Sequence, residues 1–154
     1  MKKIIFLVFI LVLVYLIMPV KTLIISGNKT AVFSVDDDFE FKISFIHSVE
    51  LCRWIEIYRV EGNEIHLIET LTKSAGWGLP STGNFSFKVV NGEGWMSYKM
   101  DRRFKSITIS TSKFNNYELI FDNKTLKLDV FGKLVTIEVK SLPRFALWGW
   151  NIGS

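Results

Sequence analysis

The chain has 154 residues, which is enough for one domain and a short additional segment. Apolar residues make up 49% and aromatic residues 14% of the chain, a composition that excludes an intrinsically disordered protein. The formal net charge of +4 arises from lysines and arginines scattered along the sequence. A nucleic-acid-binding protein usually concentrates them in a stripe or patch, so no nucleic-acid partner is expected.

The N-terminal segment predicts export. Residues 1–20 read MKKIIFLVFILVLVYLIMPV, two lysines followed by an apolar run from Ile4 to Met18. The run is near the lower limit for a membrane-spanning helix, about 17 residues, and slightly long for the apolar core of a cleaved signal peptide. Because no Ala-x-Ala pattern follows, we favour an uncleaved single-pass anchor through residues 4–20, with Lys2 and Lys3 in the cytoplasm. The alternative is a protein secreted after signal cleavage, and both interpretations place the folded part outside the membrane.

Beyond residue 21 the sequence alternates short strands with turns. The predicted strands are rich in β-branched and aromatic residues and are bounded by Gly, Asn or Asp. They cover residues 22–26, 31–35, 39–47, 53–60, 64–72, 85–90, 95–100, 106–111, 117–121, 125–130 and 134–139. This pattern predicts an all-β fold, an antiparallel sandwich or barrel preceded by one apolar N-terminal helix. We divide the chain into a signal anchor or signal peptide (1–21), an extracytoplasmic β-domain (22–140) and an aromatic C-terminal tail (141–154).

The stretch FIHSVE, residues 45–50, ends a strand on polar residues. Along the alternating strand 39–47, His47 continues the apolar face of Phe45. Matching this face to the next strand pairs Phe45 with Ile57 and His47 with Ile55, which leaves Glu56 on the opposite face. A slip of one residue would instead place His47 beside Glu56.

No recognisable catalytic set follows from these residues. Ser48 and His47 are neighbours on a strand and point to opposite faces, so His47 is not placed to activate Ser48 as a nucleophile. Cys52 is the only cysteine, which excludes an intrachain disulfide, and we interpret it as a small residue near a turn. We expect neither a cofactor nor a metal site. The alternative is a metal-assisted hydrolase, whose ligands would come from the two histidines and the nearby glutamates: His47, His66, Glu50, Glu56 and Glu69.

A second polar landmark is KSAGWGLPSTGN, residues 73–84. The residues Gly76, Gly78 and Pro80 indicate an irregular loop rather than a strand. Trp77, between two glycines, could cover a pocket or contact a partner. A crossover loop of a sandwich remains the alternative interpretation.

Several motifs, in this order and spacing, resemble the domain-of-unknown-function family numbered eighteen-fifty, small exported prokaryotic proteins. The resemblance covers about residues 39–130. The first motif is a His-Ser-Val-Glu stretch, and the second is a Glu followed by a Tyr in the next strand. A Leu-x-Leu-x-Glu strand, a Gly-rich loop before proline and a later Gly-Trp element follow. They correspond here to His47, Ser48, Val49, Glu50, Glu56, Tyr58, Ile65, Leu67, Glu69, Gly76, Gly78, Pro80 and Trp95. Trp77 departs from the family, which usually has Ala there.

The resemblance implies a role in solute uptake rather than catalysis. Genes of this family often stand beside those of TAXI-type TRAP transporters, which take up organic solutes with an extracytoplasmic binding protein. We therefore expect a non-enzymatic accessory binding module that contacts TRAP transporter subunits or the solute-binding protein, with a self-contained ligand-binding domain as the alternative. The predicted binding residues are His47, Ser48, Glu50, Glu56, Glu69, Gly76, Trp77, Gly78 and Pro80.

Overall fold

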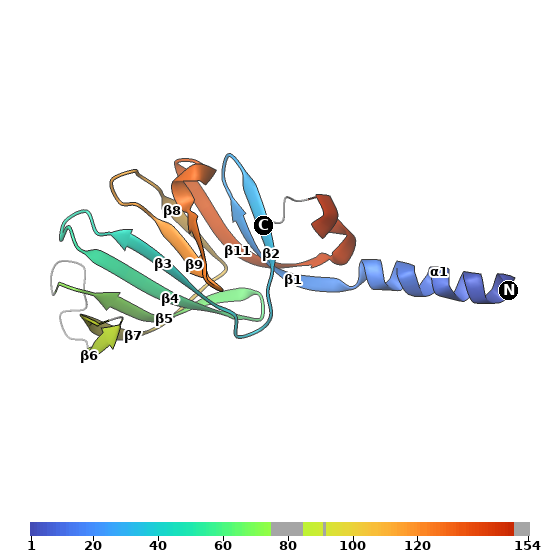
Figure 1. Cartoon of the computed structure of the whole chain (residues 1–154), viewed down its shortest axis with the longest axis horizontal. Helices are drawn as coiled ribbons and strands as arrows, with labels where there is room; N and C mark the ends of the chain where they lie inside the picture. The colour runs from blue at the N-terminus through green and yellow to red at the C-terminus, as the bar shows by residue number, and fades with distance from the viewer. Residues whose placement is uncertain (75–84, 91, 150–154) are drawn as a thin grey trace.

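Two antiparallel sheets face each other, and an N-terminal helix projects from one end (Figure 1). The computed structural model describes residues 1–74, 85–90 and 92–149. The small sheet has the order β2 (Thr30–Ser34), β1 (Pro19–Ser26), β11 (Leu134–Pro143) and β8 (Ser106–Ser110). The large sheet has the order β10 (Lys124–Lys127), β9 (Glu118–Phe121), β3 (Glu40–Ile46), β4 (Arg53–Glu61), β5 (Glu64–Thr72), β7 (Glu93–Phe104) and β6 (Phe85–Val90).

The predicted all-β fold is confirmed. Of the two predicted forms, the structure shows the sandwich and not the barrel. Each predicted strand corresponds to an observed one, and over the described residues the two sheets do not close into a barrel. The predicted strand 125–130 is shorter than expected, because the chain turns into the 3-10 helix η1 (Leu128–Phe131) and buries Leu128 and Phe131. The predicted division at residues 21 and 140 stays a prediction, and β1 and β11 run across these positions.

The core lies between the sheets and is rich in aromatic rings. Leu23 and Ile25 of β1 are fully buried against it. Phe41 and Tyr58 stack with their ring centroids 5.2 Å apart, and Phe33 meets Phe121 edge-on at 5.0 Å. Such pairs stabilise a core by about 1 kcal/mol beyond the apolar area that they bury.

The predicted register between β3 and β4 is wrong. The observed pairs are Phe41 with Tyr58, Ile43 with Glu56 and Phe45 with Trp54. The core-facing side of β4 therefore carries Trp54, Glu56 and Tyr58, and the isoleucines of β4 lie on the outer side. Both faces of this strand carry large apolar residues, so the apolar alternation alone could not select the face that packs inward.

The N-terminal helix α1 (Lys2–Ile17) confirms the predicted apolar helix, and the anchor through residues 4–20 stays a prediction. In the described part of the chain, the structure contains no helix with the length and apolar character needed to cross a membrane. The span was predicted to reach Val20, whereas α1 ends at Ile17 because Pro19 disfavours helical geometry at Met18, which is extended (φ −54°, ψ 129°).

The C-terminal 3-10 helix η2 (Arg144–Gly149) lies beside the end of α1. The backbone N–H of Arg144 donates to the Met18 carbonyl at 3.1 Å, and its Nη1 donates to the Tyr15 hydroxyl at 3.2 Å. The Arg144 guanidinium also lies 4.4 Å from the centre of the Tyr15 ring. Arg144 therefore joins the two ends of the described chain.

Candidate functional site

His47 opens a closed turn between β3 and β4. Its backbone N–H donates to the Cys52 carbonyl, and its own carbonyl accepts from Leu51, both at 2.9 Å. The His47 Nδ1 accepts from the backbone N–H of Glu50 at 3.3 Å. The His47 ring stacks on Trp54 with the centroids 4.7 Å apart, and Trp54 is only 8% exposed. His47 thus caps the core at the end of the sheet, while Ser48 is exposed.

The His47 turn is tied to the end of β5. The Ser74 hydroxyl donates to the Glu50 carboxylate at 2.7 Å, and the Thr72 hydroxyl and Ser74 backbone hydrogen-bond each other at 3.2 Å. The Cys52 sulfur lies 3.8 Å from the Thr72 hydroxyl, which places this thiol in a turn contact. Two predicted site residues, His47 and Glu50, therefore lie where the Gly-rich loop begins. The predicted residues Gly76, Trp77, Gly78 and Pro80 fall outside the described residues.

Glu56 lies on the inner side of the large sheet. It pairs with Ile43 on β3 and Thr70 on β5, and the Tyr58 hydroxyl donates to its carboxylate at 2.7 Å. Burial raises the pKa of Glu56, although the Tyr58 hydrogen bond and the charge of Arg102 oppose this effect. Burial and the Glu56 charge likewise raise the pKa of Tyr58.

Glu69 lies on the other side of the same sheet. Lys88 and Ser97 donate hydrogen bonds to its carboxylate. Burial pushes the pKa of Glu69 upward, but these hydrogen bonds and the nearby lysine charges outweigh burial and leave the pKa lowered. The structure thus places Glu56 and Glu69, both predicted binding residues, on opposite sides of the large sheet.

The remaining histidine forms a cluster of its own. His66 Nδ1 lies 2.9 Å from Glu61 Oε1, and His66 Nε2 lies 2.7 Å from Asp101 Oδ1. Arg103 completes this cluster by donating to Glu61. Residues 1–74, 85–90 and 92–149 hold no group of three or more His, Cys, Asp or Glu side chains that could bind a metal.

A pocket of about 560 Å³ lies over the outer side of the large sheet. We call it the outer-face pocket, and it is lined by Lys42, Ser44, Arg53, Ile55, Lys73, Val90, Glu93, Trp95 and Ile120. Its lining comes from β9, β3, β4 and β7 and from the ends of β5 and β6. The lining combines apolar side chains with three cations and one carboxylate, so its formal charge is positive.

Trp95 lines this pocket with a side chain that is almost completely buried. The side chain is 4% exposed, and its indole Nε1 is buried with no hydrogen-bond partner among the described residues. Lys73 Nζ lies 5.0 Å from the centre of the Trp95 ring and 2.7 Å from the Glu93 carboxylate. A buried donor left unpaired costs about 1–3 kcal/mol.

The sequence contained a signal for this pocket that we did not use. A strand face toward solvent should be polar, yet the outer side of β4 carries Ile55 and Ile57, and Leu71 beside them is 4% exposed. Apolar residues on both faces of a strand indicate that something covers, or binds to, the outer face.

The comparisons with known proteins identify a family. The profile described as "Domain of unknown function (DUF1850)" matches residues 41–128, which is more than half of the chain and contains every residue of the outer-face pocket. Neither the curated proteins nor the solved structures contain a match to this chain. The motifs around His47, Glu69 and Trp95 fall within the matched range, and the chain belongs to the DUF1850 family.

Proposed function

We propose that this protein is a non-enzymatic binding module that takes a small organic anion in the outer-face pocket. The observation that supports this proposal is the grouping of Lys42, Arg53 and Lys73 around apolar side chains that include Ile55, Trp95 and Ile120. Ligand pockets typically combine an apolar lining with a few polar groups that fix orientation. The volume of about 560 Å³ suits a small molecule.

The lining favours a carboxylate on an apolar body. The carboxylate would accept from Arg53 or a lysine, and the body would pack on Ile55, Trp95 and Ile120. Charge-assisted hydrogen bonds of this kind are about twice as strong as neutral ones.

We further propose that the module acts outside the cytoplasm as an accessory to a solute uptake system of the TAXI-type TRAP class. The apolar helix α1 supports attachment to a membrane, because none of its residues is buried against the sandwich. The His47 turn supports a partner surface, because Val49 and Leu51 are 65% and 66% exposed beside it.

Ligand binding is tested by calorimetry on the full chain in a mild detergent. The probes are benzoate, acetate and the uncharged benzamide. Benzoate should bind most tightly, because it alone combines the charge with an apolar ring. Arg53→Gln should weaken benzoate binding about tenfold, since a hydrogen bond to a charged group is lost.

The matched control is Lys140→Gln on β11, whose ammonium contacts Glu138 at 2.7 Å, away from the pocket lining. This variant should bind benzoate as the native protein does. Equal affinity for benzoate and benzamide, or equal losses in Arg53→Gln and Lys140→Gln, would contradict the proposal.

A further inference from the structure

A second pocket lies at the end of the sandwich and has a different lining. Its volume is about 380 Å³, and we call it the end pocket. Three connections form it, namely the β1–β2 turn, the loop after β8 and the turn from η1 into β11. The lining residues are Asn28, Thr111, Ser112, Lys113, Asp129, Gly132 and Lys133. Four of these seven residues lie outside the range matched by the family profile.

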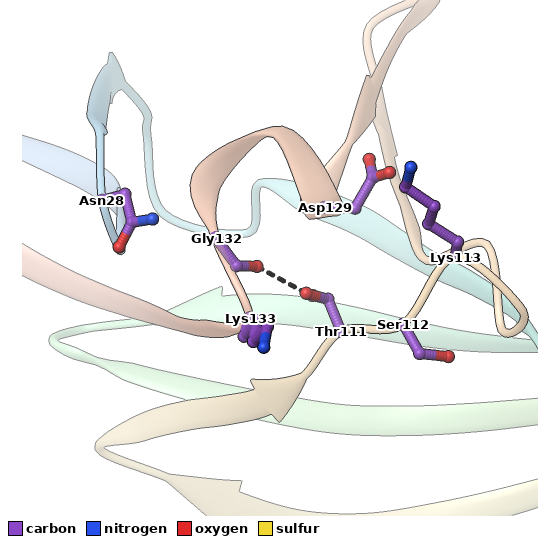
Figure 2. A pocket seen from close by; sticks show the side chains of 7 residues that line it. All are labelled: Asn28, Thr111, Ser112, Lys113, Asp129, Gly132 and Lys133. Carbon is purple, nitrogen blue, oxygen red and sulfur yellow. Dashed lines mark hydrogen bonds between the residues drawn. The ribbon is translucent and has the colours of Figure 1, made fainter.

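Backbone hydrogen bonds hold the three connections together. Asn28 N–H donates to the Phe131 carbonyl at 2.5 Å, and Thr111 N–H donates to the Lys133 carbonyl at 2.9 Å. The Thr111 hydroxyl donates to the Gly132 carbonyl at 2.5 Å, as the dashed line in Figure 2 marks. Because the walls are fixed before a ligand arrives, binding does not have to order them.

Gly132 is required by this geometry. Its φ is +124°, a conformation that other residues rarely adopt. A Cβ at this position would lie 3.0–3.2 Å from the side-chain atoms of Asn28. The missing side chain lets the Asn28 amide occupy one end of the pocket, and Lys113 and Asp129 lie at the other end (Figure 2).

The lining residues carry polar or charged side chains, apart from Gly132, while carbon atoms make up most of the exposed wall. Lys113 and Lys133 supply two cations, and Asp129 supplies one carboxylate, so the pocket favours a single negative charge over a double one. The Asn28 amide and Asp129 can exchange hydrogen bonds with ligand hydroxyl groups, whereas the Ser112 hydroxyl already donates to the Asn115 side chain and accepts from its backbone N–H. The lining contains none of the aliphatic and indole side chains, such as Ile55, Trp95 and Ile120, that line the outer-face pocket.

We propose that the end pocket binds a small polyhydroxylated carboxylate, a sugar acid. One of the two lysines holds the carboxylate, and Asn28 and Asp129 hold the hydroxyl groups. This site is independent of the proposed function, because it shares no lining residue with the outer-face pocket.

The test is a titration of the ¹⁵N-labelled full chain in a mild detergent with gluconate, followed by amide shifts in an NMR spectrum. Gluconate should shift the amides of Asn28, Thr111 and Lys133 and leave those of Ser44 and Ile55 in the outer-face pocket unmoved. Glucose, which has the hydroxyl groups but no carboxylate, should bind more weakly than gluconate. Acetate, which has the carboxylate but no hydroxyl groups, should also bind more weakly. Inorganic phosphate should also bind more weakly, because Asp129 opposes a second negative charge.

Three variants separate the ligand contacts from the fold. Lys133→Gln and Lys113→Gln should each weaken gluconate binding about two- to fivefold, as expected for an exposed ion pair. Asn28→Ala should weaken gluconate more than acetate. Lys140→Gln, the matched control, should bind gluconate as the native protein does.

Three outcomes would overturn this inference: no shift of the end-pocket amides at saturating gluconate, tighter binding of phosphate than of gluconate, or equal losses in Lys133→Gln and Lys140→Gln. The readout is independent of benzoate binding, so a failure here leaves the outer-face pocket unaffected.

Discussion

At the scale of single residues, Glu56 is the carboxylate most constrained by its surroundings. It sits on the inner side of β4 between Trp54 and Tyr58, and burial raises its pKa above the usual value of 4.5. A carboxylate with a raised pKa favours the folded state in its protonated form. The contribution of protonated Glu56 to the free energy of unfolding is therefore fully present below the pKa of the unfolded chain. This contribution is lost as the pH rises through the pKa of the folded protein.

We expect Glu56→Gln to remove this pH dependence. Gln stays uncharged and can still accept from the Tyr58 hydroxyl. As the pH rises above about 4.5, the free energy of unfolding of the variant should increase relative to that of the native protein. Urea denaturation at a series of pH values measures this difference, and a difference that is constant with pH would contradict the burial of a charged Glu56.

Glu69→Gln should show the opposite trend. Burial raises the pKa of Glu69, but the hydrogen bonds from Lys88 and Ser97 lower it more, so its net pKa lies below 4.5. The stability from a lowered pKa is present above the unfolded pKa and is lost as the pH falls through the folded pKa. The variant should be less stable than the native protein at neutral pH, and the gap should narrow in acid. Equal slopes for the two variants would contradict the opposite pKa shifts of Glu56 and Glu69.

How much of the site could be predicted differs from residue to residue. His47 and Glu50 could be placed together because they belong to one short turn, which local sequence determines. The direction of Glu56 could not, because it depends on which face of β4 packs inward, and both faces are apolar. Lys42, Arg53 and Lys73 lie far apart in sequence, and only the pairing of β3, β4 and β5 brings them around Trp95.

At the scale of the elements, β6 is an edge strand with few features that would prevent it from pairing with another chain. Phe87 and Val89 are 79% and 77% exposed, and Phe87 pairs with Met96 on the inner side of the large sheet. Edge strands usually carry charges that prevent pairing with other chains, and the one charge on β6, Lys88, contacts Glu69 on the outer side. At the opposite edge, β10 is short and carries Lys124 and Lys127.

We expect Phe87→Lys to reduce self-association at little cost in stability. An exposed side chain contributes little to the fold, so the free energy of unfolding should change by less than about 0.5 kcal/mol. Light scattering at increasing protein concentration measures the association, and Val60→Lys in the core is the contrasting variant that should unfold the protein. Unchanged scattering, or a large loss of stability in Phe87→Lys, would contradict this assignment.

The strands themselves could be predicted well, since alternation and turn residues are local signals. Gly62 (φ +61°) lies in the predicted turn between β4 and β5, and Asp122 and Asn123 (φ +43° and +63°) lie in the one between β9 and β10. The distribution of the strands over two sheets could not be predicted, because it depends on contacts between distant segments, such as β1 with β11.

At the scale of the whole molecule, the proposed partner contact can be tested by affinity purification. The tagged full chain is recovered from gently solubilised native membranes, and the co-purified proteins are identified by mass spectrometry. We expect transporter subunits with the native chain and their loss with both His47→Ala and His47→Phe. His66→Ala, on the outer side of β5, should retain them.

His47→Phe distinguishes contact from packing, because its ring can still stack on Trp54. If His47→Phe retains the subunits while His47→Ala loses them, His47 acts through packing and is not a contact residue. Recovery of no transporter subunit with the native chain would contradict the proposed partner.

The pairing of β1 with β11 also sets the order of events during synthesis. It joins Pro19 to Pro143 and Ser26 to Thr136, so the first strand made finds its central partner only when the last strand has left the ribosome. Folds with such distant pairings form slowly. The small sheet therefore cannot be completed until β11 is made, and this order suits a protein that, as proposed, crosses a membrane before it folds.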